Sequence, residues 1–332
     1  MKRFLLIIIA LMLAVSFAGC SADSLGDYKK AADKTDQIKK GQTAGEFSVE
    51  VDFNTDGMTE EQIKELNYFK NMKGSFNIAF DDDTEQGVFR NYLNFGGLGF
   101  DFDMFVNKEE VFMKLPVIGK YMRLEDMQAP MLRSQEALDI QIISRETQKG
   151  ISEKWLGMLK QEDIFRGKDI VLTTPDGEVK TTEYTIKLND SQIKSLAADS
   201  LDMLSRDEKL KENYEEYIKK NVEMMEDTSF EKLFEDVKNN MKDYTVEGFS
   251  YTAHVDIDGY IVSERIEVSL KVNDAKPATA TRLSYKLDIK NWDINKDQRF
   301  EFPVLTEENT LDMEEMDKSM PFMMEDLFRN KD

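Results

Sequence analysis

The stretch GFSYTAHVDIDGYIVSERIEVSLKV, residues 248–272, decides the fold. Apolar and polar residues alternate through most of it, which is typical of β-strands with one buried face. The pair Asp258-Gly259 in its middle favours a tight turn, because glycine readily adopts the positive φ angles that short hairpin loops require. The stretch therefore predicts two long antiparallel strands.

The same alternation occurs in two blocks of the chain. The first block opens with EFSVEVDF (46–53), in which every second residue is apolar. Its other predicted strands cover residues 74–82, 87–95, 98–106, 110–115 and 120–124, with turn residues between them. The second block holds a hairpin over 168–189 and strands at 248–272, 280–292 and 298–305. This order predicts antiparallel sheet in both blocks.

Helical periodicity fills the remaining segments. A first helix is predicted over 27–40, with Asp27 as its N-cap and Gly41 as its stop, and a second begins after Thr59. Further helical segments are predicted within 126–159, 190–210, 209–221 and 230–241. No linker rich in proline and serine divides the chain, so the sequence predicts a single domain of the α+β class.

The chain starts with a predicted signal peptide over residues 1–19. Lys2 and Arg3 precede the uncharged stretch FLLIIIALMLAVSFAG (4–19). This combination is typical of secretory signals, and the stretch is shorter than the roughly 20 apolar residues of a membrane-spanning helix. We therefore expect export, and no comparable apolar stretch follows.

The single cysteine, Cys20, comes directly after this segment. Phe17-Ala18-Gly19-Cys20 resembles the lipobox of bacterial lipoproteins, although leucine is usual at the position of Phe17. The resemblance implies cleavage before Cys20 and a diacylglyceryl group on its thiol. Two acyl chains give stable anchoring, whereas one gives only marginal binding. The alternative is cleavage after Ser16, with Cys20 an unmodified buried cysteine.

The charge balance excludes whole classes of partner. The chain carries a net charge of −21, and loss of Lys2 and Arg3 with the signal would make it −23. Such a surface repels nucleic acid and anionic lipid headgroups, so nucleic-acid binding is not expected. With 41% hydrophobic residues the chain still has ample material for a core.

The order of elements behind a lipobox is similar to that of the LolA-like superfamily, including the LppX/LprG-like lipoproteins of Gram-positive envelopes. The stretches that carry the likeness are GQTAGEFSVEVDF (41–53), EEVFMKLPVIGKYMRL (109–124), IVLTTPDGEVKTTEYTIKL (170–188), VDIDGYIVSERIEVSLKV (255–272) and FEFP (300–303). The resemblance implies an unclosed antiparallel β half-barrel with helices covering the concave face. It also implies a hydrophobic cavity that holds a lipid or acyl chain, and the helical insertion after Asp190 is longer than the family minimum.

Bulky apolar residues of the first block are the candidate lining of that cavity. They are Val49, Val51, Phe76, Ile78, Phe80, Phe100, Phe102 and Met104. The 19 methionines of the chain add flexible side chains that suit varied apolar ligands. The alternative is that these residues meet the helices in a filled core, because every half-buried sheet has such a face.

Catalytic and metal-binding patterns are scarce. His254 is the only histidine, so zinc sites and nucleophile systems built on histidine are not expected. Asp293, Asn295 and Asp297 imitate the start of an EF-hand loop, but Gln298 replaces its glycine. The acidic turns at 81–83 and 256–259 are interpreted as turns first. Five methionines between Met313 and Met324 indicate the apolar face of a terminal helix rather than a copper site.

The sequence thus predicts a lipoprotein held by Cys20 on the extracytoplasmic face of a Gram-positive cell membrane. Its expected parts are the signal peptide (1–19), a lipidated tether (20–26), the half-barrel domain (27–305) and an acidic, methionine-rich tail (306–332). We expect it to bind a lipid or other apolar ligand, without enzymatic activity, cofactor or metal. The alternative is a structural or interaction lipoprotein with a filled core.

Overall fold

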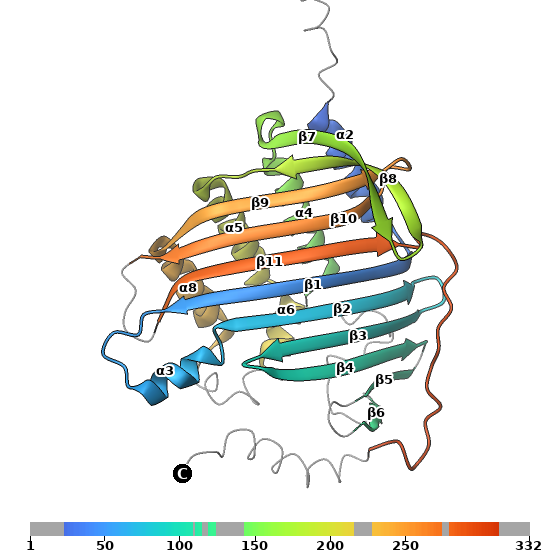
Figure 1. Ribbon diagram of the computed structural model, residues 1–332, viewed down its shortest axis with the longest axis horizontal. Helices are drawn as coiled ribbons and strands as arrows, with labels where there is room; N and C mark the ends of the chain where they lie inside the picture. Colours follow the sequence, from blue (N-terminus) through green and yellow to red (C-terminus); the bar gives the residue numbers. More distant parts are fainter. Residues whose placement is uncertain are drawn as a thin grey trace, which may run out of the picture.

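The computed structural model describes residues 23–108, 110–114, 119–123, 143–215, 228–273 and 279–311. These residues form one antiparallel sheet of eleven strands, and a layer of helices lies behind it in Figure 1. The sheet runs from β6 (Tyr121–Arg123) at one edge to β7 (Ile164–Thr174) at the other without closing. The predicted fold class, α+β with an unclosed antiparallel half-barrel under helices, is therefore confirmed.

Two meanders make up the sheet. The first contains β1 (Lys40–Phe53), β2 (Asn71–Asp81), β3 (Gln86–Phe95), β4 (Leu98–Asn107), β5 (Glu110–Lys114) and β6 (Tyr121–Arg123). The second contains β7 (Ile164–Thr174), β8 (Gly177–Ile186), β9 (Tyr244–Asp256), β10 (Ile261–Val272) and β11 (Ala280–Trp292). Within each meander neighbours in sequence pair with each other, and β1 pairs with β11 to join the two. The hairpin predicted at residues 248–272 is β9–β10.

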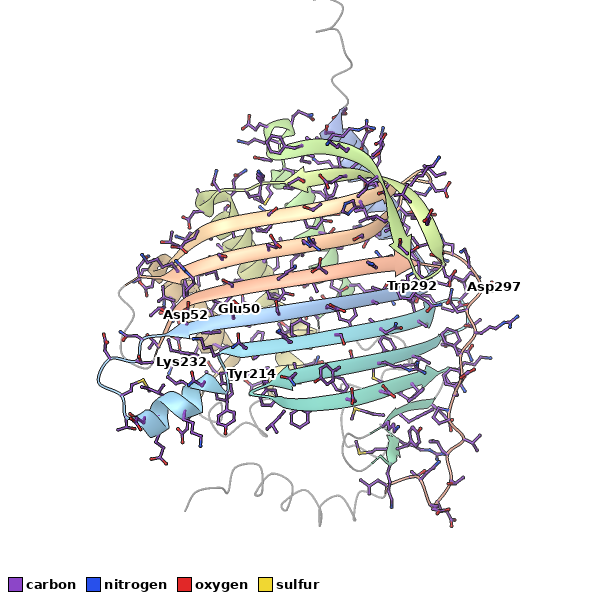
Figure 2. The ribbon with its side chains drawn as sticks, in the orientation of Figure 1. Glu50, Asp52, Tyr214, Lys232, Trp292 and Asp297 are labelled. Carbon is purple, nitrogen blue, oxygen red and sulfur yellow. The ribbon has the colours of Figure 1, made fainter. Side chains whose placement is uncertain are left out.

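The register separates the two faces of the sheet. Val51 of β1 lies opposite Leu283 of β11, and Ile266 of β10 lies opposite Tyr251 of β9; these side chains share the face under the helices. Glu50 and Asp52 of β1 alternate with them and are exposed (Figure 2). The alternation seen in the sequence thus becomes one apolar and one polar face.

Side-chain caps fix where the helices begin. The helices are α2 (Ser24–Thr35), α3 (Glu60–Asn67), α4 (Arg145–Met158), α5 (Asp190–Leu204), α6 (Glu208–Asn213) and α8 (Phe230–Asn240). Thr59 caps α3 as predicted, through a capping box with Gln62. The predicted start of the first helix at Asp27 is wrong, because Asp23 accepts a hydrogen bond from the Gly26 amide and starts the helix at Ser24.

The helices pack on the second meander. Tyr28 and Ala31 of α2 are buried against Tyr251 and Ala253 of β9, and the same cluster includes Ile186 of β8. At full burial a side chain the size of Ile186 contributes roughly 1.5–3 kcal/mol to stability, and an alanine less. This contact holds α2 against the sheet and forms one wall of the site described below.

The predicted strand at 298–305 is wrong. Its apolar residues alternate, but Phe300, Phe302 and Leu305 pack on the buried cluster of Val88, Phe105 and Phe112 instead of joining the sheet. In Figure 1 the segment runs past the ends of the strands toward β6. Alternation here reflects burial of an extended chain on an existing core, and Pro303 has no amide hydrogen for a ladder.

Several predicted features lie outside the described residues. These are the signal peptide with Cys20, the helical segment at 126–142, the end of the segment at 209–221, and the methionines from Met313 onward.

Candidate functional site

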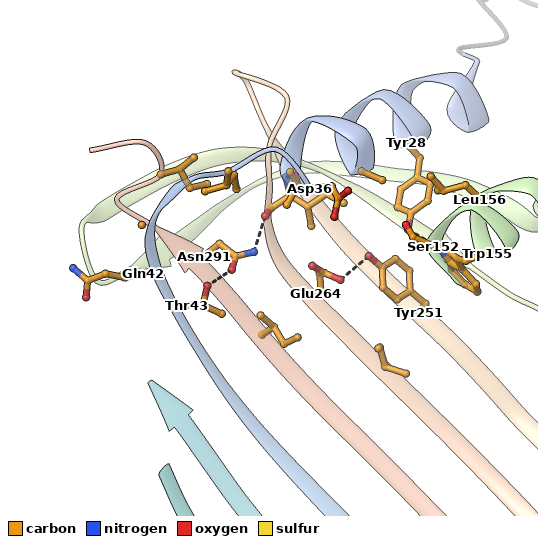
Figure 3. A pocket seen from close by; sticks show the side chains of 18 of the residues that line it. Tyr28, Asp36, Gln42, Thr43, Ser152, Trp155, Leu156, Tyr251, Glu264 and Asn291 are labelled. Carbon is orange, nitrogen blue, oxygen red and sulfur yellow. Dashed lines mark hydrogen bonds between the residues drawn. The ribbon is translucent and has the colours of Figure 1, made fainter. Parts of the chain in front are cut away.

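A cavity of about 650 Å³ lies between the sheet and the helices α2 and α4 (Figure 3). The helices contribute Tyr28, Ala32, Thr35, Asp36, Ser152, Trp155 and Leu156. The strands and their flanking residues contribute Ile38, Gly41, Gln42, Thr43, Phe80, Phe249, Tyr251, Ile261, Glu264, Ile266, Ile289, Asn291 and Ile294. Ligand cavities are typically about 300–1,000 Å³, so the volume is suitable for a small amphiphile.

Aromatic rings build one wall of the cavity. The ring of Trp155 on α4 meets those of Phe249 and Tyr251 edge to face, at 6.1 and 5.7 Å between centroids. Tyr28 on α2 makes the same kind of contact with Tyr251 at 5.9 Å. The Trp155 indole Nε1 donates a hydrogen bond to the Tyr28 hydroxyl at 3.1 Å. Rings held from several sides give this wall a fixed shape.

A carboxyl group, that of Glu264, stands among these apolar residues. The Tyr251 hydroxyl donates a hydrogen bond of 2.8 Å to its Oε2 (Figure 3). Burial raises the pKa of Glu264, and the hydrogen bond from Tyr251 offsets only part of that effect. Burial also raises the pKa of Tyr28 to about 12 and that of Tyr251 well above its ordinary value. Both phenols therefore keep their protons and can act as donors.

Polar residues at the neighbouring strand ends are satisfied by the protein itself. Thr43 of β1 donates to Asn291 of β11 at 2.9 Å, and the Asn291 amide donates to the Ile261 carbonyl at 3.0 Å (Figure 3). The Thr35 hydroxyl accepts a hydrogen bond from the Ile261 amide at 2.8 Å and ties the end of α2 to β10. These groups fix the cavity wall, whereas Glu264 is held from one side only.

The eight predicted lining residues share the face of the sheet that carries the cavity, but only Phe80 belongs to its lining. Val49 and Val51 lie farther along β1, and Phe100, Phe102 and Met104 lie on β4, beyond the cavity. The Phe76 ring covers Gly45 of the neighbouring strand, where it would collide with a Cβ atom. Ile78 lies opposite Thr43 on the same face.

Sequence reasoning missed the polar centre of the cavity. A signal for Glu264 exists, because it occupies the apolar phase of β10, together with Ile266, Val268 and Leu270. A charged residue in the buried phase of a strand indicates a special environment. Nothing in the local sequence pattern indicates that Tyr28 and Trp155, which are 127 residues apart, form a hydrogen bond in the cavity wall.

The other face of the sheet has a larger, polar hollow of about 1,090 Å³. One row of its lining follows the register across eight strands: Asp103, Arg90, Asn77, Ala44, Lys290, Ser263, His254 and Glu183. Arg265 and Asp288 in the next row form an ion pair, and Lys290 donates to the Thr173 carbonyl on the β7 strand at 3.3 Å. An apolar ligand there would strip water from these charges, so this face does not suit a lipid.

His254 lies in this hollow. Its Nε2 is 3.6 Å from the Glu183 carboxylate, and its buried Nδ1 has no hydrogen-bond partner. Burial lowers the pKa of the imidazole, and the attraction of Glu183 does not restore it. We therefore interpret His254 as a structural residue, and its lowered pKa can be measured by titration.

The acidic turns have structural partners. Asp297 pairs with Lys40 at 2.7 Å, and Asp293 pairs with Lys296 at 2.9 Å. Asp81 accepts hydrogen bonds from the amides of its own turn. Within the described ranges, no group of three or more histidine, cysteine, aspartate or glutamate side chains is arranged to hold a metal ion.

Comparisons with known proteins found no family model and no curated protein that matches the chain. Among solved structures, the chain is similar to lipovitellin, in a structure of its lipid–protein interactions, with 9% identity and a TM-score of 0.24. That match covers 80% of this chain and 26% of the lipovitellin chain. A β-barrel-like protein of unknown function from Brucella abortus matches with 10% identity and a TM-score of 0.18, over 77% of this chain and 100% of that one. We draw no functional argument from similarities of this size.

No helix among the described residues is long and apolar enough to cross a membrane.

Proposed function

We propose that this protein is a membrane-anchored, extracytoplasmic lipoprotein that binds a lipid or another apolar ligand between its sheet and helices. The observation that carries the proposal is the cavity of about 650 Å³ under α2 and α4. Its walls are mostly aromatic and aliphatic side chains. Each methylene of an acyl chain buried there contributes roughly 0.8 kcal/mol to binding.

The anchor rests on the lipobox-like sequence that ends at Cys20. A diacylglyceryl group on this residue would hold an acidic protein at a membrane surface that otherwise repels it. The helix α2 begins at Ser24, so few residues separate the anchor from the wall of the cavity. A Cys20→Ser variant is expected to leave the membrane fraction for the soluble fraction. Unchanged membrane association would contradict the anchor.

Native mass spectrometry after gentle extraction tests ligand binding. We expect the protein to carry bound lipid, and an Ile289→Trp variant to lose it, because the larger side chain fills the cavity. Lys290→Trp is the matched control, since it places the same ring on the next residue of β11 but on the opposite face. A wild-type protein that never carries or takes up lipid would favour the filled-core lipoprotein instead.

A further inference from the structure

The cavity lining is one-sided in charge. Of its 20 lining residues, two have carboxyl groups, Asp36 and Glu264, and none of these 20 is a lysine, arginine or histidine. A site for an anionic headgroup needs a compensating cation or several converging donors, because a buried negative charge without a partner is costly. The lining therefore opposes ligands with a negatively charged head.

Glu264 instead offers a site for a ligand head that donates hydrogen bonds. Among the described residues only Tyr251 donates a hydrogen bond to its carboxyl, through Oε2. No basic side chain of the described ranges forms an ion pair with it. A carboxyl held on one side by a phenol and bordering a cavity can accept a further hydrogen bond on its other oxygen.

Two hydrogen bonds and a contact between aromatic rings hold the side chains around Glu264 in place. Trp155 donates to the Tyr28 hydroxyl, and Tyr251 donates to Glu264, while the Tyr28 and Tyr251 rings are in contact. This arrangement fixes the carboxyl at the aromatic wall, next to Ile266 and Ile289, which offer surface for a hydrocarbon chain. A polar point beside an apolar wall is the geometry of a site for an amphiphile.

We propose that the cavity selects amphiphiles whose head donates hydrogen bonds and carries no negative charge, with Glu264 as the residue that receives the head. The inference rests on the proposed function and adds the class of ligand. Alkyl ammonium and alkyl alcohol heads both satisfy it, because each donates to the carboxyl. A free fatty acid, as a carboxylate, has no hydrogen to donate to Glu264 and finds no cation in the lining.

Trp155 provides the readout, because it lines the cavity and the chain contains only two tryptophans. The purified full chain is titrated with dodecylamine and dodecanoate below their micelle concentrations and with dodecanol below its solubility limit, at physiological ionic strength. Screening then limits the effect of distant surface charge to about 8 Å. We expect saturable fluorescence changes with the amine and the alcohol, and binding about tenfold or more weaker for dodecanoate.

A pair of variants assigns the selectivity to Glu264. Glu264→Gln keeps the size of the side chain but replaces the carboxyl group with a neutral amide that also donates hydrogen bonds. We therefore expect dodecylamine to bind more weakly and dodecanoate to bind more tightly. Glu267→Gln makes the same exchange of carboxyl for amide on the same strand, on the exposed opposite face, and should leave the ranking unchanged.

The outcomes separate the two proposals. Dodecanoate binding as tightly as dodecylamine to the wild type would overturn the selectivity while leaving apolar binding intact. No saturable change with any of the three probes would instead contradict the proposed function. If Glu264→Gln does not fold, the affinities of the wild type for the three probes still test the selectivity. The same titration of Tyr251→Phe, which removes the only described hydrogen-bond donor to the Glu264 carboxyl, then tests whether this carboxyl receives the head.

Discussion

At the scale of single residues, adjacent strands show how the face of the sheet determines chemistry. His254 lies opposite Ser263, and the next residue, Glu264, lies opposite Ala253 on the other face. The sequence indicates both faces through the phase of the alternation, and Glu264 stands out because it breaks the apolar phase. The phase does not reveal that His254, on the polar face, is shielded from water with an unpartnered Nδ1, because that depends on the neighbouring strands.

The lowered pKa of His254 predicts a specific dependence of stability on pH. Burial disfavours its protonated form in the folded state, so the unfolded chain, with an ordinary pKa of 6.5, binds the proton first. Stability is therefore unaffected above that value and falls as pH decreases through it toward the lower folded pKa. Two charged neighbours act on the pKa of His254 in opposite directions: Glu183 raises it and Arg265 lowers it.

Two measurements check this expectation. Because the chain has one histidine, a single imidazole signal in a nuclear magnetic resonance titration reports its pKa directly. Denaturation between about pH 7.5 and about pH 5.5 should then show a larger loss of stability in the wild type than in His254→Asn. A folded pKa at or above 6.5 would contradict the prediction.

Glycine residues in the central strands make room for aromatic rings. A Cβ atom at Gly45 would lie 2.2 Å from the Phe76 ring, so Gly45→Ala must displace that ring. Overpacking of this kind costs about 1–3 kcal/mol of unfolding free energy, measurable by chemical denaturation. Gly248→Ala in β9, where no atom lies within 4 Å of the added carbon, is expected to cause no loss. Equal effects of the two substitutions would contradict this packing.

At the scale of elements, alternation predicted strands well because a half-buried sheet imposes a period of two on its sequence. The same signal failed for residues 298–305, where an extended segment buries Phe300 and Phe302 on a core without pairing. Helix starts depend on a single cap, and the predicted N-cap, Asp27, lies four residues after the observed one, Asp23. The predicted lining residues of β2 and β4 share one face of the sheet, but of these only Phe80 lines the cavity, because α2 and α4 cover a different part of the sheet.

Asp207 joins two of the helices in the covering layer. Its Oδ1 caps α6 by accepting from the Leu210 amide, and its Oδ2 accepts from the amide and hydroxyl of Ser144, the N-cap of α4. Burial opposes its charge, but these hydrogen bonds prevail and lower its pKa. Asp207→Ala is therefore expected to cost about 2–4 kcal/mol of unfolding free energy.

Urea denaturation with a circular dichroism readout checks the loss. Arg206→Ala, an exposed substitution at the preceding residue, serves as the control and should stay within about 0.5 kcal/mol of the wild type. A similar small effect of Asp207→Ala would show that the link between α4 and α6 contributes little.

At the scale of the whole molecule, one strand pair unites the chain. β1 follows α2 near the start of the described residues and β11 lies near their end, yet the two pair over almost their full length. Local patterns cannot predict such a pairing, because they do not report which distant strands are neighbours. The fold class could be predicted as an open antiparallel half-barrel under helices, but the order of the strands comes from the structure.

The pairing of β1 with β11 predicts where an engineered disulfide will form. Ser48 lies directly opposite Lys286, so their Cβ atoms are about 4.5–5.5 Å apart, close to the roughly 3.5–4.5 Å of a disulfide. In a Cys20→Ser background, which removes the only native thiol, Ser48→Cys with Lys286→Cys is expected to oxidise readily. Closing so long a loop should raise the unfolding free energy by up to about 5 kcal/mol.

A shifted pair tests the register as well as the strand order. Ser48→Cys with Ser284→Cys places the second thiol two residues along the same face of β11, about 7–8 Å away, which is too far for a relaxed disulfide. Mass spectrometry of the oxidised proteins and their denaturation with and without reductant distinguish the two designs. Bonding of the shifted pair, or of neither pair, would contradict the register that joins the two halves of the sheet. Bonding of the first pair alone would show that the cavity is carried by one continuous sheet, because its floor draws on β1 and β11 together.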